Sequence, residues 1–94
     1  MSIFVCIPKF ELGDVRITRG AQHELPSDEV LEALTRHVAG DWGELDDEDR
    51  RQNDAALEHG FRLLSRYSTI SRTVFWIITE HDRSATTILL PNEY

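Results

Sequence analysis

A short stretch near the C-terminus combines an acid, an imidazole, a guanidinium and several hydroxyl groups. An acid–base ribonuclease needs one group to take the 2′-hydroxyl proton, another to protonate the leaving oxygen, and a cation on the phosphate. Glu80, His81 and Arg83 are of the right residue types for these roles. The alternative is a polar hairpin turn, in which Asp82 accepts the turn hydrogen bond and the other groups are solvated. In order, the residues of the stretch are Glu80, His81, Asp82, Arg83, Ser84, Thr86 and Thr87.

A second cluster lies where a predicted helix ends. Arg36 and His37 come just before residues 40–43, in which Asp41 and Trp42 stand between two glycines. With Asp41 as its orienting carboxylate, His37 would be a general base, and Trp42 would stack on a base or another ring. In the other interpretation, His37 meets the dipole at the helix C-terminus, and Trp42 fills the core at a tight turn that glycine permits.

Metal and cofactor sites are not expected. The four histidines show no ligand spacing, such as two histidines four residues apart on a helix. The five glycines are scattered and form no phosphate-binding loop. Cys6 is the single cysteine, which excludes a disulfide within one chain, and its apolar neighbours indicate a small buried hydrophobe.

The negative charge of the chain is concentrated in its middle. Residues 24–58 contain twelve carboxylates against three arginines, a net charge of −9. The segments on either side each carry about +1, and the whole chain carries −7. A surface of this kind repels a phosphate backbone and attracts a basic groove, so direct binding of nucleic acid is not expected.

Two interpretations of this acidic block remain open. Charge runs are commonly solvated faces that keep a small protein soluble. Alternatively, carboxylates placed regularly on two helices imitate the phosphates of DNA and bind a nucleic-acid-binding protein with a basic groove. The predicted partner-binding residues are Asp41, Glu44, Asp46, Asp47, Glu48, Asp49, Asp54 and Glu58.

Residues 36–94 resemble a group of small proteins found on bacterial plasmids and other mobile elements. The resemblance implies a mobile-element setting and no established chemistry. It rests on Arg36-His37-x-x-Gly40-Asp41-Trp42-Gly43, on Glu48-Asp49, Asn53, Ala56 and Leu64-Ser65-x-Tyr67, and on Trp76-Ile77-Ile78-Thr79-Glu80-x-Asp82-Arg83-Ser84-x-Thr86-Thr87-x-Leu89-Leu90-Pro91-x-Glu93-Tyr94.

The order of elements is also similar to that of barnase-like ribonucleases, in which helices precede an antiparallel sheet. In that family a histidine followed by threonine stands near the last strands, where this chain has His81 with Thr86 or Thr87. Those nucleases usually carry a basic face, and this acidic chain departs from that pattern.

The elements that position these residues follow from local signals. Ser27 can cap a helix whose apolar residues, Val30, Leu31, Leu34 and Val38, fall on one face before Gly40 ends it. Asp46 or Asp47 caps a second helix that runs to Glu58, with Gly60 as its stop.

Strand patterns occur at both ends of the chain. Residues 3–7 and 14–18 indicate two strands, and residues 61–69, 73–79 and 85–90 indicate a three-stranded meander. The predicted fold is therefore α+β, a single domain over residues 1–94 with two helices packed on an antiparallel β-sheet in ββααβββ order. No signal peptide or membrane span is expected, and the expected location is the cytoplasm of a bacterial host cell.

We therefore expect a small non-enzymatic protein of a mobile genetic element. It would inhibit a nucleic-acid-targeting host defence complex, of the kind attacked by anti-CRISPR or anti-restriction proteins, through its acidic face. One alternative is a barnase-like ribonuclease or toxin that uses Glu80, His81 and Arg83. Another is an antitoxin-like or regulatory subunit that binds a basic protein partner, and the sequence leaves homo-oligomerisation open.

Overall fold

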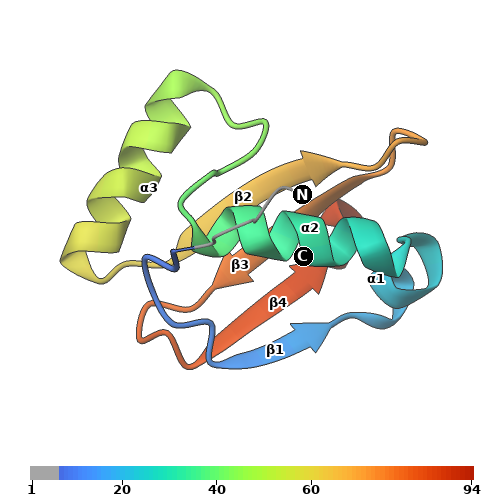
Figure 1. Ribbon diagram of the computed structural model, residues 1–94, viewed down its shortest axis with the longest axis horizontal. Coiled ribbons are helices and arrows are strands. Elements are labelled where there is room, and N and C mark those ends of the chain that lie inside the picture. Colours follow the sequence, from blue (N-terminus) through green and yellow to red (C-terminus); the bar gives the residue numbers. More distant parts are fainter. Residues whose placement is uncertain (1–6) are drawn as a thin grey trace, which may run out of the picture.

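The sheet has four strands in the order β1-β4-β3-β2 in the computed structural model, which describes residues 7–94 (Figure 1). Strands β2, β3 and β4 form the predicted antiparallel meander, whereas β1 pairs with β4 in parallel. The strands are β1 (Asp14–Ile17), β2 (Leu63–Ser68), β3 (Val74–Thr79) and β4 (Ala85–Leu89).

The expectation of a purely antiparallel sheet was therefore wrong. Helices connect β1 to β2 and return the chain to the same end of the sheet, so β2 runs in the direction of β1. Two tight turns then give β4 that direction again, and β4 lies beside β1. The predicted strand over residues 3–7 lies outside the described residues except for Ile7, which belongs to no strand, and Cys6 also lies outside them.

Three α-helices and a short 3₁₀ helix complete the domain. The helices are α1 (Arg19–Glu24), α2 (Ser27–Val38), α3 (Asp47–His59) and η1 (Pro91–Glu93). Helix α1 was not predicted, because six residues are too few to show a helical period. Its capping residue is Thr18, whose hydroxyl accepts a hydrogen bond from the Ala21 amide at 3.3 Å.

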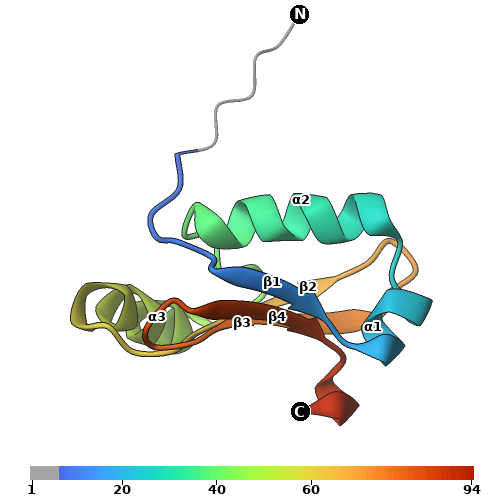
Figure 2. The same cartoon turned by 90° about the horizontal axis from the view of Figure 1, so that it is seen from below.

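Helix α2 covers one face of the sheet, and η1 with the C-terminus lies on the other side (Figure 2). Ala33 and His37 on α2 are buried, but Leu31 is 65% exposed and does not belong to the core-facing side as predicted. The residue before the helix, Pro26, occupies the capping position without a side-chain hydrogen bond, so Ser27 is not the cap. The main core beneath α2 contains Ala21, Leu25, Ala33, Tyr67, Phe75, Ile77 and Ile88.

Helix α3 lies beside β2, the sheet edge farthest from β1 (Figure 1). The prediction for its ends is confirmed: the Asp46 carboxylate accepts a hydrogen bond from the Asp49 amide at 2.8 Å, and Gly60 ends the helix with a φ of 75°. Its buried side is narrow and packs on a second small core formed by Trp42, Ala56 and Leu63 with Phe10, Leu45 and Leu57. None of the helices within residues 7–94 has the length and apolar character that a membrane crossing requires.

Candidate functional site

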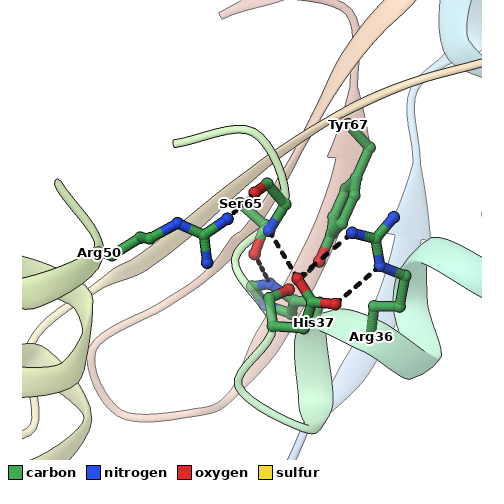
Figure 3. A network of polar contacts seen from close by, with 7 residues as sticks. Arg36, His37, Arg50, Ser65 and Tyr67 are labelled. Carbon is green, nitrogen blue, oxygen red and sulfur yellow. Dashed lines mark hydrogen bonds and ion pairs between the residues drawn. The ribbon is translucent and has the colours of Figure 1, made fainter. Parts of the chain in front are cut away.

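His37 lies in the core between α2 and the sheet, and its side chain is fully buried. Its Nδ1 is 2.6 Å from the Ser65 hydroxyl (Figure 3). Its Nε2 is 2.8 Å from the Thr79 hydroxyl. Burial, helped by the nearby positive charge of Arg83, lowers the pKa of His37 to about 3. The imidazole is therefore neutral at physiological pH and has no contact with solvent.

The hydrogen bonds continue beyond Thr79 and determine the tautomer of His37. The Thr86 hydroxyl donates to the Leu12 carbonyl oxygen at 2.7 Å and also lies 2.8 Å from the Thr79 hydroxyl. Because a carbonyl oxygen only accepts, the single hydroxyl proton of Thr86 is used there, and Thr79 must donate to Thr86. Thr79 then accepts from Nε2–H of His37, and Ser65 donates to Nδ1. This polar chain ties α2 to three strands.

Asp41 does not orient His37. Its carboxylate accepts hydrogen bonds from Arg36 Nε at 2.9 Å and Nη2 at 3.3 Å, and from the Gly43 amide at 3.0 Å (Figure 3). The hydrogen bond from Arg36 holds the pKa of Asp41 below its usual value. Burial raises the pKa of Tyr67 to about 12, and its hydroxyl donates to the Asp41 carbonyl oxygen at 2.5 Å. These contacts fasten the turn after α2 to β2.

Trp42 is a core residue with 1% of its surface exposed. Its ring stacks on Phe10, with 6.2 Å between centroids, and its Nε1–H donates to the Asp54 carboxylate at 2.9 Å. The interpretation of Trp42 as a core anchor thus agrees with its burial, and the exposed stacking surface of the other interpretation is not formed. Asp54, predicted to bind a partner, serves as the acceptor of the indole.

Arg83 connects the last hairpin to the C-terminal end of α3. With a φ of 61° it turns its guanidinium toward backbone carbonyl oxygens, including Phe61 at 2.6 Å, Glu80 at 3.0 Å and Ala56 at 3.2 Å. In the same turn, the Asp82 carboxylate accepts from the Ser84 amide at 3.0 Å. The cation proposed for a substrate phosphate is therefore engaged with the protein backbone.

The other residues of the ribonuclease hypothesis lie apart from one another in the structure. His81 is exposed at the tip of the hairpin, whereas Thr86 is buried in the His37 hydrogen-bond chain. Thr87, next along β4, points to the opposite face of the sheet because side chains alternate along a strand. Imidazole, threonine and guanidinium do not converge on one surface.

The predicted partner-binding carboxylates are all exposed, but half of them already have local roles. Asp41 pairs with Arg36, Glu44 accepts from the Ser68 hydroxyl, Asp46 caps α3 and Asp54 holds Trp42. No hydrogen bond or ion pair engages the carboxylates of the other four within residues 7–94. These four are Asp47, Glu48, Asp49 and Glu58.

The helical period of α3 separates the four carboxylates into two groups. Asp47, Glu48 and Glu58 fall on the side away from the buried Asn53 and Ala56, and we call these three residues the acidic face. Arg51 lies on the same side, yet the ion pairs in the described part of the chain involve only Arg16 with Asp14 and Arg36 with Asp41. The acidic face is therefore not neutralised within the domain.

Asp49 instead lines a cleft of about 550 Å³ between α3 and β2. Phe61, 62% exposed, forms part of its apolar wall. Asn53 holds the cleft together, because its side-chain amide donates to the Leu64 carbonyl oxygen at 2.5 Å and accepts from the Leu64 amide at 3.2 Å. No role was expected for Asn53 from the sequence, although its place as a polar residue on the narrow buried side of α3 was a signal that could have found it. Leu64 and Asn53 also line the cleft, and the remaining lining residues are Leu45, Gln52, Ala55, Ala56 and Arg62.

Comparisons with protein-family models, with curated proteins and with solved structures give no significant match. Within residues 7–94, no group of three or more metal-binding side chains is arranged to hold an ion.

Proposed function

We propose that this chain is a binding protein of a mobile genetic element that inhibits a nucleic-acid-targeting defence complex in the bacterial cytoplasm. The observation that carries the proposal is the acidic face of α3. Asp47, Glu48 and Glu58 are exposed there without partners among the described residues. The helix stands at the side of the sheet, where its outer surface is open to another protein (Figure 1).

Charge complementarity supplies the physical basis of the interaction. Carboxylates spaced along a helix present negative charge to the lysines and arginines of a groove that otherwise holds phosphates. Such contacts speed association and weaken as salt is added. A protein with this surface competes with the nucleic acid for the groove.

The cleft beside α3 adds an anchoring point to the proposed interface. A lysine or arginine side chain of the partner would lay its aliphatic stem against Phe61 and Leu64 and bring its charge to Asp49. Interfaces derive most of their affinity from a few anchors of this kind, while rim charges contribute mainly to specificity and association rate.

The geometry of the catalytic candidates favours binding over catalysis. His37 is buried and neutral, and the guanidinium of Arg83 is hydrogen-bonded to carbonyl oxygens. An antitoxin-like or regulatory subunit would use the same acidic face, so the identity of the partner distinguishes these two possibilities.

Neutralising the acidic face tests the proposal. The triple variant Asp47→Asn, Glu48→Gln, Glu58→Gln removes three charges and keeps the side-chain shapes. Asp46 is left unchanged because it caps α3, and losing a cap destabilises a helix by about 0.5–2 kcal/mol. The control variant Glu11→Gln, Glu24→Gln, Asp28→Asn removes the same net charge from other exposed positions.

Each protein serves as bait in a bacterial lysate and is expressed in cells that restrict or cleave incoming DNA. We expect the wild type and the control to retain a nucleic-acid-binding complex, to release it in high salt, and to protect the incoming DNA. The triple variant should lose both effects while keeping its melting temperature. The acidic-face mechanism would be refuted if the triple variant retained the complex as well as the wild type does. It would also be refuted if added duplex DNA did not reduce the amount of complex that the wild type retains.

A further inference from the structure

The free edge of β1 is the least covered part of the sheet. All four residues of this strand are exposed, including Val15 at 50% and Ile17 at 39%. An uncovered edge offers unpaired amide and carbonyl groups to another strand. Within the described residues, no element pairs with this side of β1.

The pairing with β4 shows which residues direct their backbone groups outward. The amides of Asp14 and Thr18 donate to the carbonyl oxygens of Ser84 and Ile88 at 2.9 and 3.0 Å. Backbone groups alternate sides along a strand, so Arg16 also faces β4, and Val15 and Ile17 direct their amides and carbonyls to the free edge.

We propose that β1 pairs with β1 of a second copy of this chain, antiparallel and centred on Val15. The two Val15 residues then exchange both of their backbone hydrogen bonds. Asp14 of each copy stands directly opposite Arg16 of the other, in the non-hydrogen-bonded positions where side chains approach most closely. The sequence Asp14-Val15-Arg16 is thus complementary to itself in this register.

Neighbouring registers are unfavourable. Centring the pair on Arg16 or on Asp14 places like charges directly opposite each other. Centring it on Ile17 would require Arg19 to pair as a strand residue, but α1 already begins there. The charges on this edge therefore oppose other registers and support the one centred on Val15.

An apolar strip beside the edge favours the same association. Val15 and Ile17 pair in register with Thr86 and Ile88, so their side chains lie on the face that α2 partly covers. Glu32 of α2 lines a hollow on the β2 flank, and the helical period places Leu31, 65% exposed, on the opposite flank toward β1. Pairing at β1 removes part of this apolar surface from water.

The resulting dimer would contain one continuous sheet of eight strands. Because α3 packs at β2, the edge farthest from β1, the acidic faces of the two copies would stand at opposite ends. This arrangement goes beyond the proposed function, since either copy alone carries a complete acidic face.

Sedimentation of the full chain from about 10 µM to about 1 mM tests the proposal, a range suited to a small interface. We expect the wild type to approach twice the mass of one chain. Asp14→Arg alone and Arg16→Asp alone create two like-charge pairs each and should weaken the dimer about tenfold. The double variant Asp14→Arg, Arg16→Asp should restore it, because the opposite charges face each other again.

Val15→Pro provides an independent test. It removes the outward amide and leaves the hydrogen bonds to β4 in place, so it should give a monomer with an unchanged circular dichroism spectrum. A wild type that stays monomeric at every concentration would overturn the proposal. The free edge of β1 would then be available only to a strand of a different protein. A dimer that the single charge reversals do not weaken, or that the double variant does not restore, would also overturn it.

Discussion

At the scale of single residues, the histidine that sequence analysis considered as a general base has a structural role. The hydroxyls around His37 bind both ring nitrogens, and the chain ends at a carbonyl oxygen that only accepts. A protonated imidazole would donate from both nitrogens, so the Ser65 hydroxyl could no longer donate to Nδ1. Burial is the main reason that the neutral ring is favoured, and the hydrogen bonds fit its Nε2–H tautomer.

This preference for the neutral ring makes the stability of the fold depend on pH. The pKa of His37 is about 3 in the folded protein, below its ordinary value of 6.5. Below pH 6.5 the unfolded chain takes up a proton that the folded chain does not. The free energy of unfolding is therefore highest above pH 6.5 and falls by up to about 1.4 kcal/mol per pH unit as the pH drops toward 3.

Urea unfolding between pH 7 and 5 measures this slope, above the ordinary pKa values of 3.8 and 4.5 at which Asp41 and Glu93, whose pKa is lowered in the fold, titrate in the unfolded chain. His37→Gln keeps hydrogen-bonding capacity without a titrating ring and is the control, with a flatter profile expected. A wild type whose stability does not change between pH 7 and 5 would contradict the buried neutral histidine.

Trp42 is the largest fully buried side chain, and its removal should unfold much of the population. Trp42→Ala should lower the free energy of unfolding by about 3–5 kcal/mol, through lost burial and the cavity left behind. Trp42→Phe keeps most of the packing but leaves Asp54 without its indole donor, so a smaller loss of about 1 kcal/mol is expected. Chemical denaturation of both variants measures the two losses of unfolding free energy and shows whether that of Trp42→Ala is the larger. A Trp42→Ala protein that keeps its melting temperature but loses its biological activity would place Trp42 on the binding surface instead.

At the scale of elements, the last hairpin and α3 depend on each other through one side chain. At the C-terminal end of α3 the Ala56 carbonyl oxygen accepts from the Gly60 and Phe61 amides. The Arg83 guanidinium donates to the same oxygen and to the Phe61 carbonyl oxygen, which joins the hairpin to the helix end. In the sequence, this arginine was a candidate for binding a substrate phosphate in the ribonuclease alternative. In the structure its guanidinium donates hydrogen bonds to carbonyl oxygens both in the turn and at the end of α3.

Arg83→Asn should therefore destabilise the fold by about 1–3 kcal/mol, because it removes the guanidinium hydrogen bonds to the Phe61 and Ala56 carbonyl oxygens that join the last hairpin to the end of α3. Asparagine tolerates a positive φ, so the substitution isolates the loss of the guanidinium from backbone strain. His81→Ala in the same turn is the matched control and should change stability by no more than about 0.5 kcal/mol.

Thermal unfolding of the two variants gives the comparison, and an RNA-cleavage assay accompanies it. If the two variants were equally stable, the hydrogen bonds of Arg83 at the end of α3 would not contribute to stability as proposed. RNA cleavage by the wild type that disappears in His81→Ala would restore the ribonuclease hypothesis.

At the scale of the whole molecule, charge and topology separate two surfaces. The acidic face lies on α3 beside β2, and the uncovered strand β1 forms the other edge of the sheet. A partner bound at α3 and a second copy bound at β1 would not compete for the same residues. Dimerisation would place two acidic faces in one particle, which raises avidity only for a target whose spacing allows both to bind.

The sequence by itself determined those features whose signals are local. Asp46 and Gly60 marked the ends of α3, the apolar period marked α2, and alternating β-branched and aromatic residues marked the meander. The acidic block was also readable, because charge is a property of composition. The sequence did not show which carboxylates remain without partners.

Only the tertiary structure decided the features that join distant parts of the chain. The parallel pairing of β1 with β4, the hydrogen-bond chain from Ser65 through His37 to Thr86, and the contact of Arg83 with Ala56 all link residues far apart in sequence. A residue type limits which bonds a side chain can form, and the fold chooses the partner. For that reason His37 and Arg83 were plausible catalytic residues in the sequence and are structural residues in the folded protein.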